Sequence, residues 1–298
     1  MIEFKNITKK FGDFVALDNI DLKIPEGTAF GLLGSNGAGK STILRVISGI
    51  YKQENGTAEI DGEKIYDNPS VKERVFFIND ETVQFAKFTL VELKNYYKAF
   101  YPKFSEEVFN NLLKKIKLPL DKKIEKFSKG MKRQAVVIIG LSCQTDYLLL
   151  DEAFDGLDPT MRIIVKNMIV DAMLDRKLTT VISSHNLKEI NEICDTVALL
   201  HQGKIIFNRD LDNVKGNIHK IQVAFEKDYS KEDFSDFELL HFEKSGSLTY
   251  LIAKGNVDEI KLKLSVKKPV LCDIIPLSLE EIFIYEMEVL GYDCSEIQ

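Results

Sequence analysis

Several features are scarce in this sequence, and each absence narrows what the protein can be. No stretch approaches the roughly 18 consecutive apolar residues of a membrane span, and Met1–Lys10 carries charges throughout without the apolar centre of a signal peptide. The formal net charge of −6 offers no excess of positive charge for binding nucleic acid. Any role at a membrane is therefore expected to come through a partner.

Cysteine is also sparse, and its positions follow no pattern of a metal site or a disulfide framework. The four cysteines are scattered along the chain at Cys143, Cys194, Cys272 and Cys294. We expect them to be reduced thiols in a cytosolic protein. The chain has neither an internal repeat nor a low-complexity tract, and its 298 residues suffice for roughly two domains.

What the sequence does contain is a glycine-rich loop. Residues 34–42 read Gly-Ser-Asn-Gly-Ala-Gly-Lys-Ser-Thr and match the template Gly-x-x-x-x-Gly-Lys-[Ser/Thr]. Strand-like Thr28–Leu33 precedes the loop, and Ser41–Ile50 follows it with a helical pattern that places Ile50 on the apolar face. Backbone N–H groups in such a loop, aided by the helix dipole, bind phosphate.

The loop predicts a phosphate ligand and assigns roles within it. Lys40 is expected to reach the β- and γ-phosphates, and Ser41 to hold Mg²⁺. The remaining predicted contacts lie in the same loop: Ser35, Asn36, Gly37, Gly39 and Thr42.

Periodicity along the chain predicts an α/β fold. Tyr147–Leu150 and Thr180–Ser183 are short apolar runs flanked by helical patterns, which is typical of buried parallel strands. A helical region follows Thr89, which with Glu92 forms a capping box. After about residue 215 the pattern changes, and residues 216–298 predict a small α+β appendage.

A pair of acids ends the apolar strand at Leu148–Leu150. Asp151 is placed to hold Mg²⁺, and Glu152 to polarise the water that attacks the γ-phosphate. A strand ending in Asp-Glu can also be a simple helix start or surface pair. The phosphate loop upstream favours the functional interpretation.

Further motifs follow in order, and with them the chain resembles the nucleotide-binding subunit of ATP-binding cassette (ABC) transporters over residues 1–215. Phe127-Ser128-Lys129-Gly130-Met131 stands where that family has Leu-Ser-Gly-Gly-Gln, and Asp155-Gly156-Leu157-Asp158 stands at its D-loop. His185 ends Ser183-Ser184-His185 as the family's switch histidine does, and Phe11 falls where an aromatic ring stacks on adenine. The resemblance implies a P-loop NTPase with a mostly parallel central sheet, an antiparallel β subdomain, and a helical subdomain at about residues 85–145.

The resemblance also implies a site shared between two subunits and loaded with ATP and Mg²⁺. Ser128 and the backbone at Gly130 would bind the γ-phosphate of an ATP held by the opposite subunit, and Asp158 would cross the interface. His185 would contact the γ-phosphate and orient water with Glu152. A head-to-tail dimer follows, formed with an identical subunit or with a second ATPase.

The sequence departs from the family at two places. Lys129 and Met131 replace Gly and Gln of the signature. Where the family has a Gln that touches Mg²⁺ and relays movement to the membrane subunit, the aligned residue is Asp80, with Gln84 as an alternative. A carboxylate can ligate Mg²⁺ but cannot donate a hydrogen bond as Gln does.

The tail points to a class of transporter. Residues 276–283, Pro-Leu-Ser-Leu-Glu-Glu-Ile-Phe, resemble the "PSLEEIF" ending of ABC-2-type exporter ATPases, which implies a membrane-spanning partner subunit and a cytoplasmic location on the inner face of the membrane. The alternative interpretation of the tail is an appendage that stabilises or regulates a dimer and has no substrate role. The alternative function is a soluble ABC ATPase acting on ribosomes or nucleic acid. A single phosphate loop, the lack of heptads and the negative charge argue against it, and no nucleic-acid partner is expected.

Overall fold

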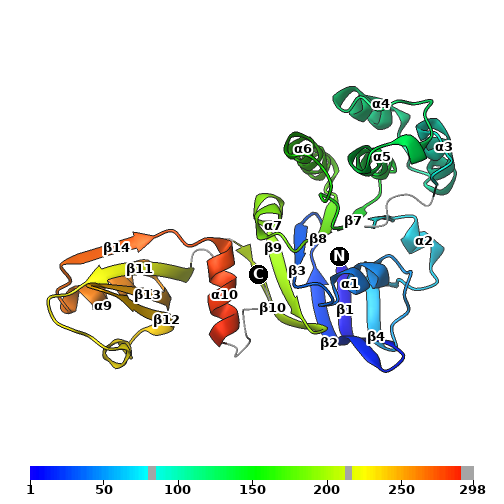
Figure 1. Ribbon diagram of the computed structural model, residues 1–298. Helices are drawn as coiled ribbons and strands as arrows, with labels where there is room; N and C mark the ends of the chain where they lie inside the picture. Colours follow the sequence, from blue (N-terminus) through cyan, green and yellow to red (C-terminus); the bar gives the residue numbers. More distant parts are fainter. Residues whose placement is uncertain (80–84, 212–216, 290–298) are drawn as a thin grey trace. The chain divides into compact units, whose positions relative to one another are not determined.

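The computed structural model describes residues 1–79, 85–211 and 217–289. The chain divides into two compact units, Met1–Asn208 and Arg209–Gln298 (Figure 1). The first unit combines a mostly parallel sheet, an antiparallel sheet and a group of helices, and the second is a smaller α+β unit. The predicted α/β class is therefore confirmed. None of the described helices is long and apolar enough to cross a membrane.

The centre of the first unit is a sheet with strand order β10-β9-β3-β8-β7-β6. Its strands are β3 (Ala29–Leu33), β6 (Val75–Ile78), β7 (Tyr147–Asp151), β8 (Thr179–Ser183), β9 (Thr196–His201) and β10 (Lys204–Asp210). β9, β3, β8, β7 and β6 pair in parallel, and β3, β7 and β8 are buried along their whole length. The carboxyl ends of these strands therefore meet at one edge of the sheet, where α/β proteins bind ligands.

A second, antiparallel sheet has the strand order β2-β1-β4-β5. Its strands are β1 (Ile2–Phe11), β2 (Phe14–Ile24), β4 (Asn55–Ile60) and β5 (Glu63–Lys64). The core of the unit lies between this sheet and the central one, with helix α1 (Lys40–Ile47) inserted there. Because Ile43, Leu44 and Ile47 are fully buried in that core, the helix that follows the glycine-rich loop is held from both sides.

Helix α1 is shorter than the sequence pattern predicts. It ends at Ile47 rather than Ile50, because Gly49 takes a left-handed conformation with φ 69°. The N–H groups of Gly49 and Ile50 bond back to the carbonyls of Val46 and Arg45. The prediction for Ile50 was wrong: its side chain is 55% exposed instead of lying on the buried face.

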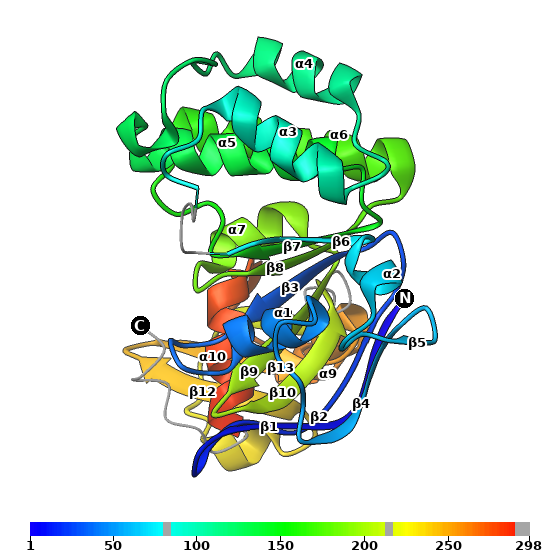
Figure 2. The ribbon, with the colours of Figure 1, turned by 90° about the vertical axis from the view of Figure 1, so that its right-hand side faces the viewer.

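Most helices of the first unit lie on one side of the central sheet, and the strands β1 and β2 lie on its other side (Figure 2). Helices α3, α4, α5 and α6 are grouped together. They are α2 (Pro69–Lys72), α3 (Leu90–Phe100), α4 (Glu106–Lys115), the 3₁₀ turn η1 (Ile124–Lys126), α5 (Lys129–Ser142), α6 (Pro159–Arg176) and α7 (Leu187–Ile193). Thr89 and Glu92 form the predicted capping box at the start of α3. Gly140 of α5 faces Phe76 of β6, and a Cβ there would lie 2.7 Å from that ring.

The second unit is an antiparallel sheet of strand order β12-β13-β11-β14 with a helix on each face. Its elements are β11 (Ile218–Ala224), the 3₁₀ turn η2 (Lys231–Phe234), β12 (Glu238–Ser245), β13 (Leu248–Lys254), α9 (Val257–Val266), β14 (Leu271–Ile275) and α10 (Leu279–Val289). Ile260 and Leu264 of α9 pack on one face of the sheet, and Ile282 of α10 packs with Ile252 on the other. This order is that of a ferredoxin-like fold whose first helix is reduced to η2. Ser278 and Glu281 form a capping box before α10.

Candidate nucleotide-binding site

The glycine-rich loop connects the carboxyl end of β3 to α1, as predicted. Gly34, Gly37 and Gly39 have φ values of 151°, 82° and 111°, a region that L side chains rarely adopt. A Cβ on Gly34 would lie 2.4 Å from the carbonyl oxygen of Leu200, and one on Gly39 would lie 2.9 Å from that of Ala16. Glycine is therefore required at both positions by conformation and by space.

The turn between β9 and β10 supports this loop from behind. Gly203 donates its N–H to the carbonyl oxygen of Ala38 at 3.0 Å. Its own carbonyl oxygen accepts the N–H of Asp18 on β2 at 2.8 Å. Backbone hydrogen bonds thus connect the loop to strands of both sheets.

Lys40 folds back over the loop that precedes it. Its Nζ donates to the carbonyl oxygens of Gly34 at 2.6 Å and Ser35 at 3.1 Å, and lies 3.9 Å from Oε1 of Glu152. Burial lowers the pKa of Lys40, while the charges of Glu152 and Asp151 oppose that shift. A phosphate oxygen at this point would offer the ammonium a stronger, charged acceptor than the carbonyls do.

Ser41 and Asp151, the two predicted Mg²⁺ ligands with described positions, are in contact. The Ser41 hydroxyl donates to Oδ1 of Asp151 at 3.0 Å, and the Asp151 side chain is buried. The Ser183 hydroxyl also donates to this oxygen, at 2.5 Å, because Ser183 lies opposite Asp151 in the β7–β8 register. Sequence reasoning assigned Ser183 no role, although it stands in the quoted Ser183-Ser184-His185 segment.

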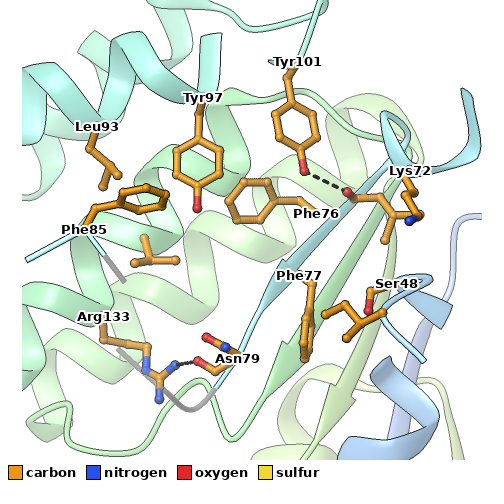
Figure 3. A pocket seen from close by; sticks show the side chains of 13 residues that line it. Ser48, Lys72, Phe76, Phe77, Asn79, Phe85, Leu93, Tyr97, Tyr101 and Arg133 are labelled. Atoms are coloured by element: carbon orange, nitrogen blue, oxygen red, sulfur yellow. Dashed lines mark hydrogen bonds between the residues drawn. The ribbon is translucent and has the colours of Figure 1, made fainter. Parts of the chain in front are cut away.

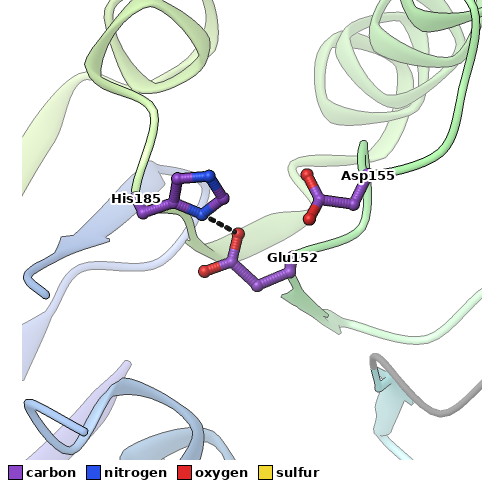
Figure 4. Close-up of side chains that lie close together, drawn as sticks. All are labelled: Glu152, Asp155 and His185. Carbon is purple, nitrogen blue, oxygen red and sulfur yellow. Dashed lines mark hydrogen bonds and ion pairs between the residues drawn. The ribbon is translucent and has the colours of Figure 1, made fainter. Parts of the chain in front are cut away.

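Glu152 and His185 also come together. Nδ1 of His185 lies 3.0 Å from Oε2 of Glu152, in the hydrogen bond drawn in Figure 4. Glu152 has a φ of 47°, and its N–H bonds to the hydroxyl and carbonyl oxygens of Ser183, each at 3.2 Å. Burial raises the pKa of Glu152, and the positive charges of His185 and Lys40 offset part of that rise. The acid is thus oriented by its backbone and shifted towards the behaviour of a general base.

Arg133, which the sequence interpretation overlooked, anchors the backbone behind Glu152. Its buried guanidinium donates to the carbonyl oxygen of Asn79 at 2.6 Å and to that of Glu152 at 3.3 Å. The only signal in the sequence was an arginine on the otherwise apolar side of α5.

A cavity of about 340 Å³ lies beside Arg133 and the end of β6 (Figure 3). Its wall includes five aromatic residues, Phe76, Phe77, Phe85, Tyr97 and Tyr101. Asn79 lines the cavity and immediately precedes Asp80. Asp80 and its alternative Gln84 both lie outside the described residues.

The predicted signature and D-loop residues cap their own helices. The Ser128 hydroxyl accepts the N–H of Met131 at the start of α5, and Asp158 accepts the N–H of Met161 at the start of α6. A Cβ on Gly130 would lie 3.1 Å from the carbonyl oxygen of Gly156, so α5 begins directly against the loop after β7. Across the described chain, no hydrogen bond or ion pair joins Ser128 or Asp158 to Lys40 or Glu152.

The remaining predicted contacts occupy the loop and its surroundings. Asn36 and Gly37 are exposed at the loop, and the carbonyl oxygen of Ser35 accepts the N–H of Ala38 at 3.2 Å. Thr42 lies half-buried in the first turn of α1. Phe11 ends β1 with its ring 45% exposed and edge-on to Tyr51, at 5.2 Å between centroids.

A glycine-rich loop at the carboxyl end of a parallel strand, with a lysine, a Ser–Asp pair and a Glu–His pair around it, defines a P-loop nucleoside-triphosphate-binding protein. The family model described as ABC transporter matches residues 17–155. The ABC transporter ATP-binding protein YtrB of Bacillus subtilis (strain 168) is 32% identical over 285 residues, covering 95% of this chain and 97% of that protein. This chain therefore belongs to the ATP-binding proteins of ABC transporters, which are ATPases.

Further comparisons agree with this assignment. The bacitracin transport ATP-binding protein BcrA of Bacillus licheniformis is 27% identical over 285 residues, covering 89% of this chain and 93% of that protein. Among solved structures, the dimeric ATP-binding cassette MJ0796, in a post-hydrolysis state with ADP and Pi, superposes with a TM-score of 0.64. It is 22% identical and covers 71% of this chain and 99% of that one, which confirms the predicted fold. These comparisons give no support to a role on ribosomes or nucleic acid.

Proposed function

We propose that this chain hydrolyses Mg²⁺·ATP with Glu152 and His185 as its catalytic residues, and that it powers a membrane exporter as one of two ATPase subunits. The observation that carries the catalytic assignment is the 3.0 Å hydrogen bond between His185 and Oε2 of Glu152, whose other carboxylate oxygen lies 3.9 Å from Nζ of Lys40. A base, a group that orients it and a phosphate-binding cation are thus gathered at one edge of the central sheet.

The Ser41–Asp151 pair suits Mg²⁺ on geometric grounds. Adjacent ligands of an octahedral Mg²⁺ at its usual bond length lie about 2.9 Å apart, and the Ser41 hydroxyl and Asp151 carboxylate oxygens are 3.0 Å apart. Both are oxygen donors, and two protein ligands leave room for phosphate oxygens and waters. When bound, the ion would neutralise charge on the phosphates, and Ser183 would hold Asp151 in place.

In this mechanism Glu152 accepts a proton from the attacking water. Its raised pKa brings it closer to the working pH than an exposed glutamate. His185 orients the carboxylate and contacts the γ-phosphate, and Lys40 stabilises the charge that develops on the phosphate oxygens. The loop N–H groups bind the remaining phosphates, and Phe11 stacks on the adenine.

We further propose that the site is completed by a second ATPase subunit. The start of α5 presents N–H groups of a 14-residue helix, with Ser128 at its N-cap and Gly130 in its first turn. Such a helix end attracts the γ-phosphate of an ATP bound to the facing subunit. Asp158, exposed at the start of α6, would contact that subunit. ATP then acts as a link between subunits, and its hydrolysis releases them.

The proposed partner in the membrane is a transporter subunit that this chain contacts from the cytoplasmic side. The match to a bacitracin transport protein, over 89% of this chain, and the Pro276–Phe283 ending support a role in export. Asn79 lines the cavity that contains the aromatic residues, and the next residue in the sequence is Asp80, which is proposed to take the coupling role. Docking of the membrane subunit near this cavity would connect it to the nucleotide through Arg133.

The Glu152→Gln variant tests the catalytic assignment. It keeps the shape of the side chain but cannot accept the proton, so kcat should fall at least about 100-fold while ATP affinity is retained. ATP should then hold the variant as a stable dimer in size-exclusion chromatography. Glu107→Gln, an exposed carboxylate on α4, is the matched control and should behave as the unmodified protein. Rapid hydrolysis by Glu152→Gln would remove Glu152 from the mechanism.

The transport role needs a separate experiment. The chain should copurify with the membrane protein encoded beside it, and the transported substrate should stimulate the ATPase activity of that complex. A chain that hydrolyses ATP but never associates with a membrane subunit would contradict the exporter proposal and leave the ATPase assignment intact.

A further inference from the structure

Asp155, which neither the phosphate loop nor the hydrolytic pair requires, lies against Glu152 and His185 (Figure 4). Each of the three side chains offers one atom that could ligate a metal, and these atoms all lie within 4.8 Å of one another. The His185 Nδ1 and Glu152 Oε2 atoms are already 3.0 Å apart. The group therefore contains one imidazole nitrogen and two carboxylates around a common point.

The backbone holds this group together. Asp155 donates its N–H to the carbonyl oxygen of Glu152 at 3.2 Å, which turns the chain after β7 and returns the Asp155 carboxylate towards Glu152. Gly156, with φ 76°, continues the turn. His185 arrives from the end of β8, whose residue Ser183 lies opposite the residue preceding Glu152. Two strand ends therefore determine the position of all three ligands.

The charge balance of the group favours a cation. Glu152 and Asp155 are both half-buried, and the charge of Asp155 disfavours the ionised form of Glu152. Lys40 approaches only Glu152, at 3.9 Å, and is itself bonded to the phosphate loop. His185 is exposed and provides an entry path from solvent.

The donor set distinguishes between metals. Zn²⁺ accepts both imidazole nitrogen and carboxylate oxygen as ligands, whereas Mg²⁺ prefers oxygen ligands alone. Two ligands of a tetrahedral Zn²⁺ lie about 3.3 Å apart at the usual bond lengths, close to the 3.0 Å between His185 and Glu152. The Asp155 carboxylate oxygen lies within 4.8 Å of both of these atoms, and a water molecule would take the fourth position.

We propose that Glu152, Asp155 and His185 bind one Zn²⁺ ion in the nucleotide-free protein, and that this ion inhibits ATP hydrolysis by occupying the Glu152–His185 pair. The metal site stands on the geometry alone. Its inhibitory effect rests on the proposed catalytic role of Glu152 and His185.

The binding experiment uses the full chain without nucleotide. Zn²⁺ is titrated by calorimetry, and Co²⁺ replaces it as a spectroscopic probe of tetrahedral ligation. Asp155→Asn, which retains Glu152 and His185, should weaken the affinity at least about tenfold. His185→Ala should weaken it similarly, and Asp175→Asn, an exposed carboxylate on α6, should leave it unchanged. Equal affinity in Asp155→Asn and the unmodified protein, or no stoichiometric binding in the latter, overturns the site.

The inhibition experiment measures ATP hydrolysis at saturating Mg²⁺ with added Zn²⁺. The Zn²⁺ concentration that halves the rate should be at least about tenfold higher in Asp155→Asn than in Asp175→Asn. Equal sensitivity of the two variants overturns the inhibitory role. A protein that hydrolyses no ATP even without Zn²⁺ would contradict the proposed function instead, and the calorimetric titration would still decide the metal site.

Discussion

Replacing Ser183 by Ala should weaken Mg²⁺ binding, although Ser183 itself is not proposed to contact nucleotide. The Ser183 hydroxyl donates to Oδ1 of Asp151 at 2.5 Å and accepts the N–H of Glu152 at 3.2 Å, and the side chain is fully buried. A hydrogen bond to a charged group contributes about 1.5–3 kcal/mol. Loss of a group that orients a metal ligand typically costs 10–100-fold in metal affinity. The Mg²⁺ concentration for half-maximal ATPase activity should therefore rise about 10–100-fold.

The adjacent serine supplies the matched control. Ser184 is equally buried and donates to Oε2 of Glu189 at 2.8 Å, away from the phosphate loop. Ser184→Ala should therefore lower the free energy of unfolding by a similar amount, about 1.5–3 kcal/mol, yet leave the Mg²⁺ dependence unchanged. The assay is phosphate release at fixed ATP across a Mg²⁺ titration, with chemical unfolding in parallel. If both variants show the same Mg²⁺ dependence as the unmodified protein, Ser183 does not position Asp151.

Three further outcomes are expected. Lys40→Ala should lower ATP affinity at least about 100-fold, because about 3 kcal/mol of charge-assisted bonding is lost; unchanged affinity by calorimetry would refute the phosphate-loop role. Glu152→Gln should stabilise the protein at neutral pH. Below pH 4.5 the carboxyl is protonated in both folded and unfolded chains, and as the pH rises from 4.5 through the raised folded pKa, ionisation favours unfolding. Melting temperatures of the two proteins should therefore converge near pH 4, and a constant difference would contradict the raised pKa. Asp80→Asn should reduce transport-coupled ATPase activity, and wild-type coupling in that variant would exclude Asp80 as the coupling residue.

Local patterns predicted the fold well where the physical cause is local. The capping box at Thr89 was readable because its two partners, Thr89 and Glu92, stand three residues apart. The parallel strands were readable because burial on both faces selects apolar runs. The end of α1 could not be predicted, because the apolar helical pattern continues to Ile50 whereas the left-handed conformation of Gly49 ends the helix earlier.

The site residues also differ in whether the sequence alone could reveal them. Lys40, Ser41, Asp151 and Glu152 stand in contiguous motifs, so the sequence alone could propose a role for each of them. Arg133, Ser183 and Asp155 act through neighbours that are distant in sequence or lie across a turn. Arginine, serine and aspartate are common residue types, so their presence alone does not indicate a functional role. Only the register of β7 with β8 and the packing of α5 assign them partners.

The turn at Gly203 has a kinetic consequence. Its backbone ties the phosphate loop to β2 through Ala38 and Asp18, so the path of the loop is held by hydrogen bonds that need no nucleotide. Little conformational entropy remains to be lost on binding, because the glycines at 34 and 39 are confined by Leu200 and Ala16. Nucleotide capture should then proceed at a rate set by diffusion and orientation rather than by a preceding rearrangement. The step that limits the proposed cycle is then expected to come after nucleotide binding rather than before it.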